Sequence, residues 1–594
     1  MATPPTAPSY RWWKEATGYQ IYPASFKDSN GDGWGDINGI TSSLDYLVAL
    51  GVDFIWISPV YESPDHDMGY DISDYEAISR KYGSMADMDR LLAEAKRRGL
   101  RVLMDLVVNH TSRDHAWFRA SRRSRDNKHS DWYIWRDPKY DAATGKRKPP
   151  NNWQAVFGGS AWTYVPERDQ YYFHLCFPEQ PDLNWENAEA RRAIYGSAIE
   201  FWLKKGIDGF RVDLVNAYAK NQSFPDAPIT DPSQEEQLPR LEWLFNGAGM
   251  HAWLREQRTA VLDKYGEDVV LIGELPVTPR DEVLRYVAPA SRELDMTLDF
   301  GLFTVGNTHW TPKLHEMRRH TLPELKRAIA ATQGLVVDAA QGWTTTFLEN
   351  HDNARSVDHF GPGGGGQYGA AAAKLLALFV TTLSGTLIVY QGQEIGMTNV
   401  PKDTWRREDL RDQVALRYLR AIDEQHPGDE ALKREAFDGI LRRGRDNTRT
   451  PMQWTGEEPH AGFSAGDAEP WMRVNPNYKT INVADQERDE QSVLSFWKTA
   501  VASRKAGPSI FIYGEYQVVD EENEQTYTYW KKSATGTGVA LVVLNFSSER
   551  AEMPSLMDEE KSSLECLMST VDIKQSDALN TPLEPWEGRV FLRR

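Results

Sequence analysis

The chain has 594 residues, with 86 Asp and Glu against 68 Lys and Arg, and a formal net charge of −18. A chain of this length exceeds one compact domain of ordinary size, so we expect two or three structural units. The negative charge argues against nucleic acid or an anionic membrane as a partner, and the only cysteines, Cys176 and Cys566, lie too far apart in sequence to indicate a disulfide framework.

The N-terminus, MATPPTAPSYRWWKE, lacks the basic start and the apolar run of a secretory signal. We therefore expect a cytoplasmic protein. The most apolar stretch, residues 370–390, contains Lys374 and several hydroxyl side chains, and it is better explained by a helix followed by a buried strand than by a membrane span.

Residues 27–39, KDSNGDGWGDING, place acidic or amide side chains at Asp28, Asn30, Asp32 and Asp36. The spacing is similar to that of an EF-hand loop, which needs a flanking helix on each side and a bidentate Glu six residues after its central glycine. Position 39 is a glycine, and the residues before the loop alternate like a strand. An EF-hand is excluded, and the loop is either a cation site of another kind or a polar turn closed by its own hydrogen bonds.

Eight short apolar runs rich in β-branched and aromatic residues recur along the chain, with amphipathic helical sequence between them. They are residues 17–24, 52–60, 101–110, 207–214, 269–275, 295–300, 344–352 and 386–392. Alternation of this kind predicts an α/β protein with a (β/α)8 TIM barrel, in which the chemistry lies on the loops at the carboxyl ends of the strands.

Two connections are too long for plain barrel loops. Residues 111–182 predict an inserted subdomain after the third strand, and about 395–490 predict an insert after the eighth. After residue 513 the pattern becomes period-two, which indicates a C-terminal antiparallel β domain, a β-sandwich, over residues 513–594. The barrel is then expected over residues 1–110 and 183–512.

Three predicted strands, the fourth, fifth and seventh, end in Asp213, Glu274 and Asp352. One such acid alone is explained equally well as a helix cap or an ion-pair member. Three at one mouth indicate glycoside hydrolysis, which needs two carboxyl groups on opposite sides of the scissile bond. Arg211 shares the inward face of its strand with Asp213 and is expected to keep it ionised, whereas Glu274 must hold its proton near neutral pH.

Seven segments, in order, resemble the conserved segments of the α-amylase family of glycoside hydrolases. They are GYQIYPASF, DLVVNH, QPDLN, GFRVDLVNA, GEL, ENHD and GTLIVYQGQEIGM. Further segments, DSNGDGWGDINGI, SPVYESPDHDMGYDISDY, QPDLNWEN and RTPMQW, are similar to the oligo-1,6-glucosidase and maltase branch. The resemblance covers nearly the whole chain and implies an α-glucosidase that acts on small oligosaccharides without an organic cofactor.

The resemblance implies that Asp213 is the nucleophile, Glu274 the general acid and then base, and Asp352 a group that grips the sugar hydroxyls. It also implies that Asp71, His110, His351 and Arg445 hold the terminal glucose. Asp71 and Arg445 are expected to pair and close the far end of the pocket, which predicts release of single glucose units from chain ends. Retention of configuration is expected if the Asp213 and Glu274 carboxyls lie about 5–5.5 Å apart.

In this branch the loop after the first strand binds a structural divalent cation, Ca²⁺ or Mg²⁺. The implied ligands are the side chains of Asp28, Asn30, Asp32 and Asp36 and the carbonyl of Trp34. The loop as a polar turn without metal stays the alternative.

Linkage preference in the branch accompanies the residue after the nucleophile, Val for α-1,6 and Thr for α-1,4. This chain has Leu214 there, so the linkage stays open. A transglucosylase or sucrose isomerase is the alternative, and a non-catalytic transporter subunit is a more distant one. We expect a monomer or homodimer.

Overall fold

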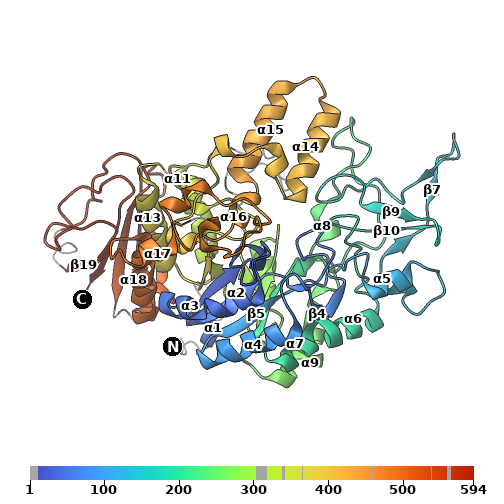
Figure 1. The fold of residues 1–594 in the computed structure, drawn as a ribbon, viewed down its shortest axis with the longest axis horizontal. Helices are drawn as coiled ribbons and strands as arrows, with labels where there is room; N and C mark the ends of the chain where they lie inside the picture. Colours follow the sequence, from blue (N-terminus) through green and yellow to red (C-terminus); the bar gives the residue numbers. More distant parts are fainter. Residues whose placement is uncertain are drawn as a thin grey trace, which may run out of the picture.

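The computed structural model describes residues 11–302, 305, 318–336, 342–363, 366–457, 459–534, 536, 538–557 and 563–593. Figure 1 shows a central barrel, a smaller unit with strands β7, β9 and β10 at one end, and a C-terminal sheet at the other. A helical hairpin, α14 and α15, projects from the barrel between them.

Eight parallel strands form the central sheet, in the order β13-β12-β11-β5-β2-β1-β15-β14. They are β1 (Thr17–Ile21), β2 (Phe54–Ile57), β5 (Arg101–Leu106), β11 (Gly209–Val212), β12 (Val270–Glu274), β13 (Met296–Leu298), β14 (Thr345–Thr346) and β15 (Thr386–Tyr390). A parallel bridge between Thr297 and Thr344 joins the two ends of the sheet and closes the ring. Each strand falls within one of the predicted apolar runs, so the (β/α)8 prediction is confirmed.

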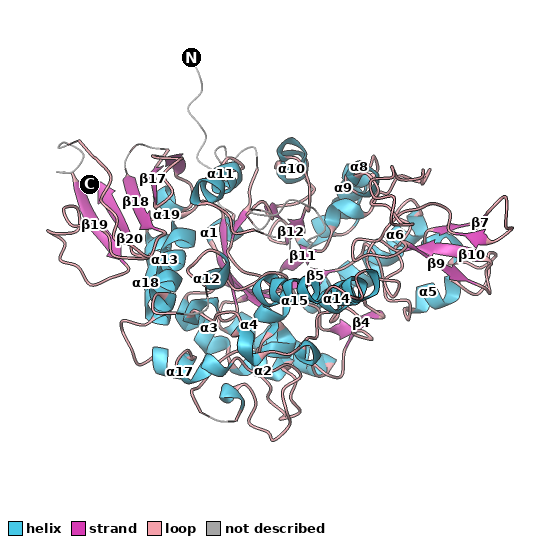
Figure 2. Cartoon of the chain, turned by 90° about the horizontal axis from the view of Figure 1, so that it is seen from above, coloured by secondary structure: helices cyan, strands magenta, loops and turns pink. Residues whose placement is uncertain are grey.

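Helices surround the barrel (Figure 2). The main ones are α2 (Ile37–Ser42), α3 (Leu44–Leu50), α4 (Met85–Arg97), α6 (Ala188–Ile194), η3 (Tyr195–Glu200), α7 (Phe201–Lys205), α9 (Met250–Ala260), α10 (Arg280–Val287), α11 (Leu322–Gln333), α13 (Gly369–Thr382) and α18 (Val493–Ala506). In α4, Ser84 and Asp87 form a capping box, and Met88, Leu91 and Ala95 face the core at helical spacing.

The unit inserted after β5 contains a three-stranded antiparallel sheet and a short hairpin. Its elements are α5 (Ala116–Ser121), β6 (Trp135–Arg136), β7 (Lys139–Tyr140), β8 (Arg147–Lys148), β9 (Trp162–Val165) and β10 (Gln170–Phe173). Trp153, Trp162 and Phe173 form its core together with Phe224 and Phe245, which come from the loop after β11. The insert therefore packs on the same loop that follows the nucleophile candidate.

Two antiparallel helices after β15, α14 (Gln413–Gln425) and α15 (Glu430–Arg443), form a hairpin with its own small apolar core. Asp412 is the N-cap of α14, and its carboxylate accepts a hydrogen bond from the Val414 N–H. Arg445 lies two residues beyond the last residue of α15. The hairpin thus places Asp412, just before its first helix, and Arg445, just after its second, at the barrel mouth.

The C-terminal strands form one five-stranded antiparallel sheet, in the order β16-β17-β18-β20-β19. They are β16 (Glu515–Val518), β17 (Thr526–Lys532), β18 (Val539–Asn545), β19 (Leu564–Ser569) and β20 (Gly588–Arg593). One face packs on α13, where the Phe379 ring lies 5.4 Å from that of Tyr527. Leu541 and Phe591 lie in a second cluster with Ala551 and Leu583, so the connecting segments, and not a second sheet among the described residues, complete the apolar layer there.

Within the described residues, no helix has both the length and the apolar character needed to cross a bilayer.

Candidate active site

One buried guanidinium gathers three carboxylates at the carboxyl ends of neighbouring strands. Arg211 Nη1 lies 2.7 Å from Asp105 Oδ1 and 2.8 Å from Asp213 Oδ1, and Nη2 lies 2.5 Å from Glu274 Oε2. Asp105 is fixed in turn by the Trp56 indole N–H, which donates to its Oδ2 over 2.8 Å. The two-residue spacing predicts that Arg211 faces Asp213, and this contact is present. Asp105 belongs to the same cluster but was not among the predicted residues.

The two central carboxyls differ in their affinity for a proton. Burial raises the pKa of Glu274 to about 8, and the nearby Asp213 charge adds to the shift. Burial also raises the pKa of Asp213, to about 6, and the charge of Arg211 opposes the shift at both carboxyls. Near neutral pH, Asp213 is therefore ionised while Glu274 keeps its proton, which is the division that a nucleophile and an acid require.

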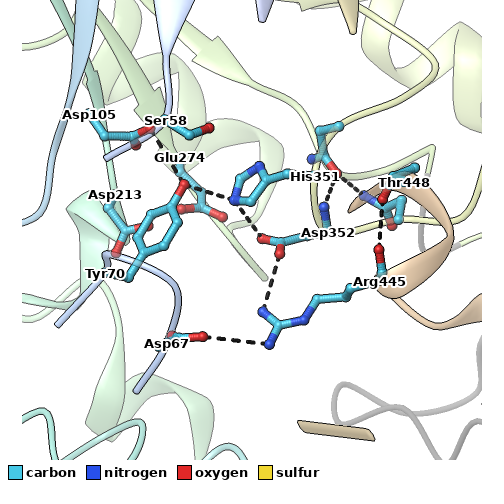
Figure 3. A network of polar contacts seen from close by, with 12 residues as sticks. Ser58, Asp67, Tyr70, Asp105, Asp213, Glu274, His351, Asp352, Arg445 and Thr448 are labelled. Carbon is cyan, nitrogen blue, oxygen red and sulfur yellow. Dashed lines mark hydrogen bonds and ion pairs between the residues drawn. The ribbon is translucent and has the colours of Figure 1, made fainter. Parts of the chain in front are cut away.

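Asp352 faces this pair from the loop after β14, beside His351 (Figure 3). Burial alone would raise the pKa of Asp352, but the charge that His351 carries when it is protonated at low pH, together with the permanent charges of Arg445 and Arg449, holds it well below the usual range. Arg449 Nη2 lies 2.9 Å from Asp352 Oδ1. Asp352 is therefore an anion throughout the working pH range.

The His351 ring is held from both sides. Its Nδ1 lies 2.8 Å from Gln20 Nε2, and its Nε2 lies 2.7 Å from the Tyr70 hydroxyl. The Tyr70 ring is stacked on it with a centroid separation of 5.4 Å. Burial lowers the pKa of His351 to about 3. The imidazole is therefore neutral, and its orientation is fixed by these contacts.

Arg445 reaches the same site from the end of the α14–α15 hairpin. Its guanidinium pairs with three carboxylates: Asp412 at 2.6 Å, Asp352 at 3.2 Å and Asp67 at 3.6 Å. The predicted pair of Asp71 with Arg445 is wrong, because no contact among the described residues joins them and Asp67 takes that place. The loop between β2 and β4 (Asp74–Ile78) folds so that the acid four residues earlier faces the cation.

Asp71 and His110 lie near the Asp67–Arg445 ion pair but do not contact Arg445. Asp71 is fully buried; its Oδ1 accepts from the Ser63 hydroxyl and the Asp67 N–H, and burial raises its pKa to about 7. Gln180 Nε2 lies 3.2 Å from Asp67 Oδ2 and 3.2 Å from His110 Nε2. The predicted sugar-binding residues therefore lie in one connected network, although their roles stay predictions.

Side chains from the inserted unit complete the surroundings. The Phe157 and Phe177 rings lie 4.6 Å apart, and the Arg445 guanidinium lies 5.9 Å from the Phe157 ring. Asp67, Asp105, Asp412 and the two phenylalanines are missing from the sequence prediction. For Asp67 a signal was available in the acid-rich segment PDHDMGYD, which offers more than one carboxylate as a partner for Arg445.

The predicted cation loop is closed by its own amides. Asp28 Oδ1 accepts from the Asn30 and Gly31 N–H groups, and its Oδ2 accepts from the Gly33 N–H over 2.8 Å. Asp36 caps α2 by accepting from the Gly39 N–H. Across the described residues, no group of three or more His, Cys, Asp or Glu side chains is arranged to hold a metal ion. The oxygen-rich donor set suits Ca²⁺ or Mg²⁺ in kind, but its carboxylates are aimed at backbone amides.

Comparison with known proteins matches this chain over most of its length. The family described as "Alpha amylase, catalytic domain" matches residues 20–514. The chain belongs to the α-amylase family. Its relatives include an α-glucosidase from Candida albicans, 44% identical with 98% of this chain and 99% of that protein covered. An oligo-1,6-glucosidase from Parageobacillus thermoglucosidasius is 42% identical, with 98% of each chain covered.

Solved structures agree with the fold. A trehalose-6-phosphate hydrolase from Bacillus licheniformis superposes with a TM-score of 0.87 at 37% identity, covering 98% of this chain and 100% of that chain. An isomaltulose synthase variant from Erwinia rhapontici superposes with a TM-score of 0.88 at 35% identity, covering 99% of this chain and 100% of that chain. The expected family, its α-glucosidase and oligo-1,6-glucosidase branch and the glycoside hydrolase class are thus confirmed.

Proposed function

We propose that this chain is a retaining, exo-acting α-glucosidase that releases single glucose units from the non-reducing ends of short α-glucosides. The observation that carries the proposal is the pair of carboxyls bridged by Arg211 at the barrel mouth. The pKa of Glu274, raised further than that of Asp213, supports a division into acid and nucleophile. Full-length relatives named α-glucosidase and oligo-1,6-glucosidase support the choice of substrate class.

In the first step, a carboxylate oxygen of Asp213 attacks the anomeric carbon as the glycosidic C–O bond breaks. Glu274 gives its proton to the departing oxygen, so the leaving sugar is released neutral and a glucosyl–Asp213 ester remains. In the second step, the Glu274 carboxylate takes a proton from water, whose oxygen attacks the same carbon and frees Asp213. Two displacements on opposite faces retain the anomeric configuration.

Asp352 and His351 are placed to bind hydroxyl groups of the glucose ring during both steps. The Asp352 anion accepts hydrogen bonds, and these strengthen as the ring gains positive character in the transition state. Arg445, held by Asp67, Asp412 and Asp352, is a group of suitable size and charge to limit the pocket to one sugar unit.

Replacement of the nucleophile tests the proposal directly. Asp213→Asn keeps the size of the side chain but removes the attacking charge, so turnover is expected to fall by at least about 10⁴-fold, with an unchanged circular dichroism spectrum. Turnover of the purified variant within tenfold of wild type would refute the assignment.

A rate panel on maltose, isomaltose, sucrose, trehalose and soluble starch tests the exo-acting mode and identifies the linkage. Rates on the disaccharides should far exceed the rate on starch, because a pocket limited by Arg445 admits only chain ends. Rapid starch cleavage to mixed oligomers would overturn this part of the proposal. Product analysis on sucrose separates hydrolysis from isomaltulose synthesis, the activity in the name of one structural neighbour.

We also propose that the loop carrying Asp28, Asn30, Asp32, Trp34 and Asp36 binds Ca²⁺ or Mg²⁺ and stabilises the fold. The support is its hard oxygen donor set. Treatment with a chelator should lower the melting temperature, and added Ca²⁺ should restore it in wild type but not in Asp32→Ala. An equal melting temperature with and without chelator would leave the loop as a polar turn.

A further inference from the structure

Two residues beside the catalytic pair hold backbone conformations that their side chains disfavour. Leu214 directly follows Asp213 and has φ 41°, and Val277 lies three residues after Glu274 and has φ 48°. A positive φ is unusual for any residue with a branched or bulky side chain, and for a β-branched residue it is a true outlier. Such conformations persist only where surrounding contacts impose them.

The contacts that impose them run between the two loops. The Leu214 N–H donates to Glu274 Oε2 over 3.1 Å. Asn216 Nδ2 donates to the Pro276 carbonyl over 2.9 Å and to Thr278 Oγ1 over 2.7 Å. Since Pro276 and Thr278 are the neighbours of Val277, the one amide fixes the strained turn on both sides.

Among the described residues, the Asn216 side chain makes only these two hydrogen bonds. Its side chain is fully buried, and its Oδ1 has no hydrogen-bond partner among the described residues. Leaving the buried Oδ1 of Asn216 unpaired is unfavourable. The two hydrogen bonds that its Nδ2 donates are therefore the contribution of this side chain. The Asn216 carbonyl accepts from the Asn246 N–H over 2.8 Å, which anchors the backbone that carries the amide.

We propose that Asn216 is a positioning residue that couples the loop after the nucleophile to the loop after the acid and thereby aims Glu274 at the leaving-group oxygen. The inference deepens the proposed function and rests on the roles given there to Asp213 and Glu274. Val277, which is 39% exposed, lies between the two residues that the Asn216 amide holds.

The test compares two substrates that share an α-glucosyl unit and differ in whether their leaving group needs an acid. The leaving group of p-nitrophenyl α-glucoside departs without protonation, whereas that of maltose requires it. In Asn216→Leu, of similar volume but unable to donate, kcat/KM for maltose should fall by about 10- to 100-fold, because misplacement of a general acid forfeits much of its contribution. For the p-nitrophenyl substrate, kcat/KM should change by less than about threefold, and Glu274→Gln should show the same contrast in stronger form.

Asn545 provides a matched control in the C-terminal sheet. It is also fully buried, and its Nδ2 also donates two hydrogen bonds, here to the carbonyls of Glu549 and Glu584. Asn545→Leu should change both substrates by the same factor. If Asn216→Leu does not yield folded protein, Thr278→Val removes one of the two bonds and should show the same contrast to a smaller degree.

Equal losses on both substrates in Asn216→Leu or Thr278→Val, or no loss in either, would overturn the positioning role. If Asp213→Asn and Glu274→Gln also kept wild-type rates, the proposed function would fail as well. If those two variants lose activity while Asn216→Leu loses the same factor on both substrates, only the positioning role of Asn216 is rejected.

Discussion

At the scale of single residues, the site depends on how three carboxyl groups share the positive charge of Arg211. Arg211 contacts Asp105, Asp213 and Glu274, so three acids compete for one positive charge in a buried place. All three pKa values are raised from their usual ranges, that of Glu274 furthest. The order of proton affinity, and not the mere presence of acids, assigns the roles.

This order predicts a bell-shaped pH dependence of kcat/KM. Activity should fall below about pH 6 as Asp213 gains a proton and above about pH 8 as Glu274 loses one. Rates on maltose across pH 4–10 measure both limbs. A plateau that extends to pH 10 would contradict the assignment of Glu274 as the acid.

The residue scale also shows what sequence reasoning reaches. The positions of Asp213, Glu274 and Asp352 follow from strand ends, because a barrel brings the carboxyl ends of its strands to one mouth. The pairing of Arg445 with Asp67 instead of Asp71 does not follow, because it depends on the path of an irregular loop. Asp412 was likewise beyond reach, since its role depends on the packing of a helical hairpin.

At the scale of elements, the α14–α15 hairpin holds Arg445 at the active site. Asp412 serves twice, as the N-cap of α14 and as the nearest partner of the guanidinium. The cap and the ion pair can be separated by substitution, since asparagine caps a helix about as well as aspartate does.

Asp412→Asn and Asp412→Ala should therefore differ in stability but not in binding. Both remove the charge that holds Arg445, and both should raise KM for maltose by about tenfold or more, as expected for loss of a charged hydrogen bond. Only Asp412→Ala should also lose about 1 kcal/mol of stability from the missing cap. Steady-state kinetics and urea denaturation measure the two effects, and equal stability of the two variants would contradict the cap.

A second element-scale feature joins α9 to its neighbours. His251 Nδ1 lies 2.6 Å from Glu293 and its Nε2 lies 2.8 Å from Glu282, and these hydrogen bonds, with Glu293 first, raise the pKa of His251. A raised pKa in the folded state contributes stability that is fully present below the unfolded value, about 6.5. That contribution is lost as pH rises through the folded value.

His251→Gln should thus be destabilised relative to wild type at pH 6, with the difference in melting temperature shrinking as pH rises above neutrality. Scanning calorimetry at pH 6, 7, 8 and 9 measures it. A difference that grows with pH would contradict a charged imidazole between the two glutamates.

At the scale of the whole molecule, the C-terminal sheet is bound to the barrel by an aromatic contact. Phe379 on α13 is buried and lies within 5.4 to 6.5 Å of the rings of Tyr527, Tyr529 and Phe546. The barrel helix therefore relies on a sheet contributed by the last part of the chain.

Phe379→Ala should cost about 3–5 kcal/mol of stability, the usual range for a buried aromatic. The variant should melt at a lower temperature, or in two transitions instead of one, while kcat and KM at 25 °C stay near wild type because the site lies elsewhere. Calorimetry with parallel assays on maltose tests this. An unchanged melting temperature would contradict a stabilising role for this contact.

The closure of the ring has a consequence during synthesis. β1 pairs with β15, so Thr17 finds its partner Leu387 only after most of the chain has left the ribosome. Until then one flank of β1 is an unsatisfied template for any other extended strand. The nascent polypeptide must therefore be shielded through a long interval, and its yield should depend on elongation rate and chaperone supply more than that of a protein whose first and second halves mature separately.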